Sequence, residues 1–177
     1  MRYIHPHKFE ERRLLEVLDL DSTVYTEELQ GTLESVRGRY KANEGMFIFA
    51  VDRADKLCGC VCFFPITDEL HEKILTEDTM FDDNIRPEEV AQYAEGRTNN
   101  IFIISVAVYP QYRGQGIGFN LIKEMFAYLN TKEKQGYKIG DILAVTASTD
   151  GEKLTTKFPF KKIRSYDDNC TLVRATL

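Results

Sequence analysis

The most informative segment of this chain is Ser105-Val106-Ala107-Val108-Tyr109-Pro110-Gln111-Tyr112-Arg113-Gly114-Gln115-Gly116-Ile117-Gly118. The apolar run 101–108 predicts a strand, and Pro110 opens a short turn after it. Three glycines at alternating positions follow, and apolar residues then recur at helical spacing from Ile117 to Tyr128. Glycines let the main chain approach a ligand, and the first N–H groups of a helix have no partner within it. The segment therefore predicts a cradle for an anion as large as a pyrophosphate.

Two common phosphate-binding motifs do not fit this glycine turn. A mononucleotide P-loop needs Lys-Ser or Lys-Thr after its last glycine, whereas Phe119-Asn120 follow Gly118. A dinucleotide fingerprint that starts at Gly114 needs glycine or alanine at position 119, where phenylalanine is too bulky for close helix–strand packing. The pattern that remains is Arg113-x-x-Gly116-x-Gly118, preceded by Val106-x-Val108-x-Pro110.

This pattern resembles the acetyl-CoA-binding segment of the GCN5-related N-acetyltransferases (the GNAT superfamily), and the resemblance covers residues 101–130. It implies an α/β (α+β) fold with a mixed central sheet, helices on both faces, and splayed strands around an acetyl-CoA cleft. It also implies acetyl transfer from acetyl-CoA, as cosubstrate, to a primary amine of a small molecule or a peptide. The plainer interpretation is a glycine-rich turn that only links a strand to a helix.

The resemblance also assigns cofactor-binding residues. It implies that the main chain of Val106, Ala107 and Val108 binds the pantetheine arm and polarises the thioester carbonyl. It implies that Ser148 lies beside the same arm. The pyrophosphate is expected on the N–H groups of Arg113, Gly114, Gln115, Gly116, Ile117 and Gly118.

The chain departs from the family pattern where catalysis is concerned. Many GNAT members carry an asparagine, then a Leu-Tyr pair shortly before Gly-Phe, and the tyrosine acts as acid to the thiolate. The corresponding positions here hold Ser148, Thr155 and Pro159. A threonine hydroxyl is a poor acid, and Ser105 is the only polar residue in 101–108, so the usual carboxylate base is missing too. The sequence therefore assigns no catalytic residue.

Two classes of function remain open. The first is an active N-acetyltransferase, which a chain of single-domain size favours. The alternative is a catalytically weak acetyl-CoA-binding sensor or regulatory module, which the loss of the tyrosine favours. The sequence leaves the oligomeric state open, with a homodimer as one arrangement.

Composition sets the broad class. A chain of 177 residues, 43% hydrophobic, is expected to form a single domain over 1–177. No apolar run follows a basic start, and none approaches the length of a membrane span, so we expect a cytoplasmic protein that does not contact membranes. A pI of about 5.3, with no basic stripe, argues against nucleic-acid binding.

The cysteines predict neither disulfides nor a metal site. Cys58, Cys60 and Cys62 alternate in one apolar strand, so their thiols should share one face, where they are poorly oriented to bridge. Cys170 lies far away in the sequence. Paired Cys/His at zinc-binding spacing is absent, and His5-Pro6-His7 is expected to be a solvated N-terminal segment. Buried, reduced thiols are the expectation.

Hydrophobic periodicity and turn residues predict the element order. A turn is expected at 21–23. Helices are expected at 8–19, 26–43, from 117 onward, and at 152–158. Strands are expected at 2–4, 46–51, 57–65, 101–108, 139–147, 161–165 and 170–175.

The segment 66–98 is predicted to be an acidic insertion. Ten acids, including Asp82 and Asp83, stand against three bases, giving a formal charge of −7 where the whole chain carries −5. By the resemblance, such a segment lies near the acceptor side of the active site, where it would attract a cationic amine. The alternative is a solvated acidic excursion without a ligand.

Overall fold

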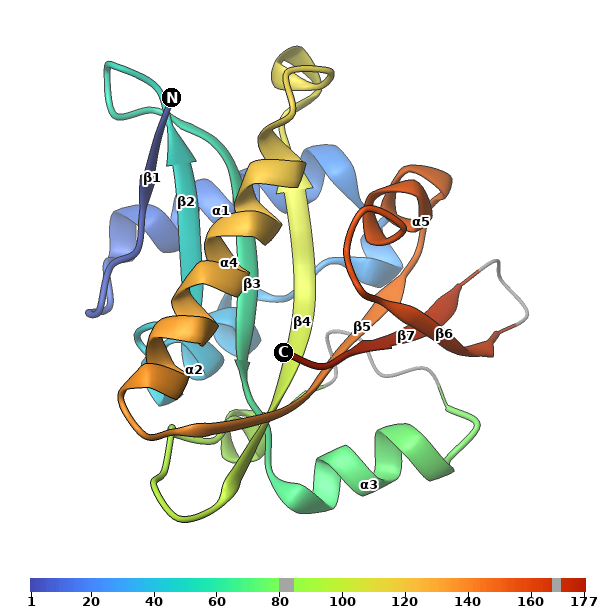
Figure 1. Cartoon of the computed structure of the whole chain (residues 1–177). Helices are drawn as coiled ribbons and strands as arrows, with labels where there is room; N and C mark the ends of the chain where they lie inside the picture. The colour runs from blue at the N-terminus through green and yellow to red at the C-terminus, as the bar shows by residue number, and fades with distance from the viewer. Residues whose placement is uncertain (80–84, 167–169) are drawn as a thin grey trace.

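The computed structural model describes residues 1–79, 85–166 and 170–177. Its strands form one sheet in the order β1-β2-β3-β4-β5-β7-β6, in which β4 runs parallel to β5 and every other pair is antiparallel (Figure 1). The strands are β1 (Arg2–Ile4), β2 (Phe47–Val51), β3 (Leu57–Pro65), β4 (Thr98–Val108), β5 (Lys138–Thr146), β6 (Lys161–Ser165) and β7 (Thr171–Ala175). The helices are α1 (Glu11–Val24), α2 (Leu33–Ala42), α3 (Asp68–Thr76), α4 (Ile117–Lys134) and α5 (Thr149–Thr155), with short 3-10 turns η1 (Glu27–Leu29), η2 (Pro87–Glu89) and η3 (Pro110–Tyr112). The predicted α/β class with a mixed sheet is confirmed.

Helices cover both faces of the sheet, as predicted. Figure 1 shows α4 crossing one face, with α1 and α2 behind the other. The apolar stripe of α4, which includes Leu121, Met125 and Leu129, is buried against the first face. The second face buries side chains of α1 and α2, among them Leu14, Leu20 and Tyr40. In the described part of the chain, no helix combines the length and the apolar character needed to cross a membrane.

The turn predicted at 21–23 is wrong, because α1 continues to Val24. The polar residues there remain helical by bonding within the helix. The Ser22 hydroxyl donates to the Asp19 carbonyl at 2.8 Å, and the Thr23 hydroxyl donates to the Leu20 carbonyl at 2.7 Å. Fully buried Leu20 anchors this last part of α1 to the core.

The second predicted helix begins later than expected. Only a 3-10 turn forms at Glu27–Leu29, and α2 starts at Leu33. Thr32 is its N-cap, because its hydroxyl accepts a hydrogen bond from the Ser35 N–H at 3.1 Å. The hairpins β2–β3 and β6–β7 are confirmed.

The prediction that three cysteines share one strand face is wrong for Cys58. The β2–β3 register shifts between Ala50 and Val51, so β3 carries a bulge at this point. Cys58 consequently packs with the α4-side cluster, whereas Cys60 and Cys62 pack with the α1-side cluster. All three are buried, as is Cys170, which confirms the expectation of buried thiols.

The central strands β4 and β5 separate halfway along their length. Their parallel pairing ends at Ile103 with Ala144. Beyond this pair β5 continues alongside β7, while β4 continues alongside β3 as far as Val108. The β3–β4 register also shifts here, leaving Ile104 without a partner in a bulge. The predicted splayed strands are therefore present, and the second half of β4 has an open edge.

Candidate active site

The glycine turn leads from the end of β4 into the N-terminus of α4. Gly114 and Gly116 adopt φ angles of +76° and +73°, a conformation that residues with a Cβ rarely adopt. A Cβ built at either position would have no neighbour within 4 Å, so conformation rather than space requires glycine there. Both glycines are exposed, which leaves the turn accessible to a ligand.

The first turn of α4 supplies unpaired N–H donors. Its first hydrogen bond runs from the Asn120 N–H to the Gly116 carbonyl at 3.0 Å. The N–H groups of Ile117, Gly118 and Phe119 precede that bond, so they have no acceptor within the helix. The Arg113 N–H differs from them, because it donates to the Pro110 carbonyl at 3.2 Å. The predicted cradle thus contains donors at the positive end of an 18-residue helix.

The open edge of β4 presents further donors. The Tyr109 N–H donates to the Cys58 carbonyl at 3.0 Å, which fixes the alternation of the β3–β4 ladder. By that alternation Ala107 directs its N–H and carbonyl toward β3, while Val106 and Val108 direct theirs toward the opening that β5 leaves. The carbonyls of Val106 and Val108 accept from the Tyr25 hydroxyl and from Arg113 Nε, both at 3.4 Å. The N–H groups of Val106 and Val108 consequently face the opening.

Helix α5 lies across the opening from β4. A Cβ built on Gly118 would lie 3.6 Å from the side chain of Leu154 and 3.9 Å from that of Val108. The end of β4, the first turn of α4 and α5 therefore converge on one place. The structure therefore brings together three segments that the sequence analysis singled out: the end of β4, the glycine turn and the region 148–155.

Aromatic packing sets the spacing between α4 and α5. The Phe126 ring stacks on Phe158 at 5.6 Å between centroids and 9° between planes. Phe119 lies 5.1 Å from Phe158, and Phe160 lies 5.9 Å from Phe126. The chain directly after α5 is thereby held against α4.

The hydroxyls of Ser148 and Thr155 have local partners. Ser148 is the N-cap of α5 and accepts from the Gly151 N–H at 3.1 Å. The Thr155 hydroxyl donates to the Glu152 carbonyl at 2.8 Å, within its own helix. A role of Ser148 beside pantetheine remains a prediction.

Sequence reasoning missed Tyr25, which follows α1 and reaches the open edge of β4. Its hydroxyl donates to Val106, 81 residues away in the chain. Burial raises the pKa of Tyr25 above its usual value, and the nearby Asp21 carboxylate raises it further. No local spacing signal marks such a residue.

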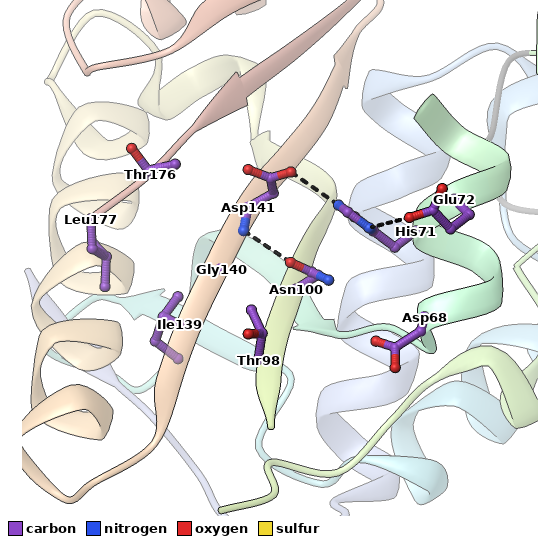
Figure 2. A pocket seen from close by; sticks show the side chains of 10 residues that line it. All are labelled: Asp68, His71, Glu72, Thr98, Asn100, Ile139, Gly140, Asp141, Thr176 and Leu177. Atoms are coloured by element: carbon purple, nitrogen blue, oxygen red, sulfur yellow. Dashed lines mark hydrogen bonds and ion pairs between the residues drawn. The ribbon is translucent and has the colours of Figure 1, made fainter. Parts of the chain in front are cut away.

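A pocket of about 430 Å³ lies at the opposite end of β4 and β5 from the glycine turn (Figure 2). His71 of α3 and Asp141 of β5 point toward one another there, with Nε2 and Oδ2 3.0 Å apart. Arg174 lies 3.7 Å from the same carboxylate, and the Asp141 N–H donates to the Asn100 side chain at 3.0 Å. The His71–Asp141 contact fastens α3 to the sheet, and the other two contacts hold Asp141 in place. At about 3.3 Å per residue, 11-residue β4 separates this pocket from the glycine turn by roughly 30 Å.

The acidic segment 66–98 is partly neutralised within the described residues. Lys73 pairs with Glu69 at 2.8 Å, and Arg86 pairs with Glu89 at 3.0 Å. Arg164 of β6 lies 3.6 Å from Asp78. Attraction of a cationic amine by this segment remains a prediction, and Asp82 and Asp83 lie outside the described residues.

Comparison with known proteins agrees with this geometry. The sequence profile described as "Acetyltransferase (GNAT) family" matches residues 14–150. A search of curated protein sequences gives no match.

Solved structures share the fold at low sequence identity. The loading GNATL domain of CurA from Lyngbya majuscula is 14% identical, with a TM-score of 0.69 over 98% of this chain and 95% of that one. Arabidopsis thaliana Naa50, solved with the bisubstrate analogue CoA-Ac-MVNAL, is 14% identical, with a TM-score of 0.65 over 99% and 98%. Mosquito arylalkylamine N-acetyltransferase like 5b is 15% identical, with a TM-score of 0.61 over 99% and 100%. At these identities the likeness concerns the fold, whereas the profile match covers most of the sequence, and this chain therefore belongs to the acetyltransferase (GNAT) family.

Proposed function

We propose that this chain is an N-acetyltransferase that moves an acetyl group from acetyl-CoA to a primary amine of a small molecule or a peptide. The observation that carries the proposal is the convergence of two sets of N–H donors. One set lies on the open edge of β4, and the other lies at the N-terminus of α4 directly beyond it. A ligand with an amide-rich arm and a pyrophosphate, as coenzyme A has, matches both sets at once.

The pyrophosphate would lie at the turn 113–118 and the first turn of α4. Anions are stabilised there by unpaired N–H groups and by the helix dipole. The turn residues proposed to bind are Arg113, Gly114, Gln115, Gly116, Ile117 and Gly118. Because the Arg113 N–H already donates to Pro110, the Arg113 guanidinium is its more available group.

The pantetheine arm would run along the open edge of β4 as an extra strand would. The N–H groups of Val106 and Val108 would bind its amides and the thioester carbonyl. Ala107 directs its main chain to β3, so its contribution would be its small side chain. Ser148, at the start of α5, would line the other side of the opening.

Chemistry in this cleft would rest mainly on positioning. Holding an amine and a thioester at attack geometry lowers the barrier by up to about 7–11 kcal/mol. An N–H donor on the thioester carbonyl stabilises the negative charge that develops on its oxygen. The amine must attack in its neutral form, so the proton that it loses passes to water.

The structures solved for relatives support a coenzyme A thioester and an amine acceptor. Naa50 was solved with an analogue that joins CoA to a peptide, and the mosquito relative is named an arylalkylamine N-acetyltransferase. Those acceptors differ in kind. The acceptor class proposed here is therefore the primary amine, without a narrower choice.

A catalytically weak acetyl-CoA sensor is the second candidate. Thr155, whose hydroxyl is bonded within α5, favours it, since that group is not poised to protonate a thiolate. Thiol release from acetyl-CoA across a panel of primary amines separates the two. Amine-dependent release, with the acetylated amine found by mass spectrometry, supports the enzyme. Saturable acetyl-CoA binding without release for any amine supports the sensor.

A further inference from the structure

The hydroxyl of Tyr25 lies at the open edge of β4. Val106 directs its carbonyl into the opening between β4 and β5, and Tyr25 donates to that carbonyl at 3.4 Å. The same residue directs its N–H into the opening, where the thioester is proposed to bind. A hydroxyl in this position is close to any group that binds along this edge.

Tyr25 is held firmly in this place. Its N–H donates to the Asp21 carbonyl at 2.9 Å, which ends α1, and its carbonyl accepts from Gln30 Nε2 at 2.9 Å. Its ring packs against the α1-side core cluster. Its hydroxyl bonds to the Val106 carbonyl at a long 3.4 Å and to the Ser105 side chain, and a charged acceptor in the opening would form a stronger bond than either.

The proton of this hydroxyl is retained. Burial raises the pKa of Tyr25 above its usual value, and two neighbouring ionisable groups, Asp21 of α1 and Cys60 of β3, raise it further. Hydrogen bonds to Ser105 and Val106 act in the opposite direction and do not outweigh burial. Tyr25 is therefore a neutral hydrogen-bond donor across the physiological pH range.

The reaction needs such a donor, and Thr155 does not supply it. When the amine nitrogen bonds to the acetyl carbon, the C–S bond breaks and its electron pair goes to sulfur. The Thr155 hydroxyl is bonded to Glu152 in its own helix. Tyr25 does reach the edge of β4, where its hydroxyl bonds to the Val106 carbonyl and to the Ser105 side chain.

Resting on the proposed function, we propose that Tyr25 is a catalytic residue whose hydroxyl donates a hydrogen bond to the departing thiolate of coenzyme A. Tyr25 keeps its own proton, because a thiol, with a pKa of about 8.5, is a stronger acid than this phenol. The proton that the amine loses reaches sulfur through water. The products are the acetylated amine and the free thiol, so charge and atoms balance.

A structural role for Tyr25 makes a different prediction, and Tyr40→Phe is the matched control. The Tyr40 hydroxyl donates to the Lys8 carbonyl at 3.2 Å, on a buried side chain away from the β4 edge. Tyr25→Phe and Tyr40→Phe thus each remove one hydroxyl bond to a main-chain carbonyl. If the Tyr25 hydroxyl only fastens the chain after α1, both variants lose stability and neither changes thiolate binding.

The experiment measures the affinities of CoA and acetyl-CoA from pH 6 to pH 9 for the wild type and both variants. A donor to the thiolate lowers the pKa of the bound thiol, so wild-type CoA binding should tighten about tenfold relative to acetyl-CoA across this range. Tyr40→Phe should keep this pH dependence, and Tyr25→Phe should lose it. With an amine that the wild type acetylates, Tyr25→Phe should lower kcat about 10- to 100-fold, while the KM for acetyl-CoA changes little.

The outcomes separate this inference from the proposed function. If Tyr25→Phe binds CoA with the wild-type pH dependence, the role of Tyr25 is overturned while the acetyl-CoA site stands. If the wild type shows no such dependence, the result is the same. If the wild type binds neither ligand at any pH, the proposed function fails, and this inference fails with it.

Discussion

Ile103 of β4 pairs with Ala144 of β5. The structure describes the rest of β4 as far as Val108, and none of these later residues pairs with β5. Antiparallel ladders on either side hold each strand after this point, β3 for β4 and β7 for β5. The opening between them is thus bounded by paired strands rather than by loops. Rigid walls suit a site that works by positioning.

Gly59 of β3 controls how closely β3 approaches the end of β4. A Cβ at this position would lie 2.7 Å from the Ala107 carbonyl oxygen and 3.1 Å from Val108 Cγ2. Gly59→Ala should push β4 away from β3, lower the free energy of unfolding by about 1–3 kcal/mol, and weaken acetyl-CoA binding. Urea denaturation and calorimetry measure the two effects. Gly38→Ala is the control, because its Cβ would lie 2.6 Å from Pro87 Cγ. This variant should lower the free energy of unfolding but leave the affinity for acetyl-CoA unchanged.

Ser148 can be tested as cap and as ligand contact together. Ser148→Ala should lower stability by about 1 kcal/mol, because the Gly151 N–H loses its acceptor. Ser148→Asp should restore stability, since aspartate is also a good N-cap. We expect acetyl-CoA affinity to remain reduced in the aspartate variant. Recovery of affinity along with stability would show that Ser148 acts only as a cap.

Thr155 should contribute little to the chemical step. Its hydroxyl is bonded to the Glu152 carbonyl, and its alcohol pKa lies far from neutrality. Thr155→Val should leave kcat within a few-fold and acetyl-CoA affinity unchanged, as steady-state kinetics with an accepted amine can measure. A fall of about 100-fold or more in kcat would show that this hydroxyl orients a catalytic water.

The expectation of a solvated segment at 5–7 is wrong for His5, whose ring packs against Phe63 and Tyr128, and this residue should make stability fall in mild acid. Burial lowers the pKa of His5 from 6.5 to about 4, and neutral Nε2 donates to the Gly45 carbonyl at 2.9 Å. The unfolded chain therefore binds a proton between these pH values that the folded chain does not, so stability rises with pH across this window. From pH 7 to pH 5 the free energy of unfolding should fall by about 2 kcal/mol from this group.

His5→Gln tests this assignment, because glutamine can still donate to Gly45 without titrating. Urea denaturation of this variant at pH 7 and pH 5 should show a smaller decrease than the wild type. An equal decrease in both proteins would place the acid sensitivity elsewhere.

The sequence predicted the β4–turn–α4 unit because its determinants are local. The positive φ angles at positions 114 and 116 favour glycine, and glycines at this spacing between a strand pattern and a helix pattern predict a tight turn that joins the two. The hairpins were predictable for the same reason. The helical run through Ser22 and Thr23 was not, since their side chains satisfy the helix or a turn equally well.

The sequence did not predict features that depend on two distant segments. The bulge at Ile104 and the reversed orientation of Cys58 arise from register between strands, which an alternating pattern does not encode. Tyr25 reaches Val106 across 81 residues, so no spacing rule connects them. The contact between His71 and Asp141 was not predicted for the same reason, because 70 residues separate the two in the sequence.

The central claim is that the turn at Gly116 holds the pyrophosphate of acetyl-CoA. Gly116 and Gly136 lie at opposite ends of α4, both with positive φ and both with open space around a Cβ. Gly116→Val and Gly136→Val should thus cost similar backbone strain, about 1–3 kcal/mol, while only the first changes the cradle.

Calorimetric titration of acetyl-CoA into the wild type and these two variants is the most direct measurement. The account predicts saturable binding by the wild type and by Gly136→Val, and at least a tenfold loss of affinity in Gly116→Val. A ligand at a hundredfold excess over its Kd should also stabilise the two binding proteins by about 2.7 kcal/mol. Absence of wild-type binding, or wild-type affinity in Gly116→Val, would contradict the account.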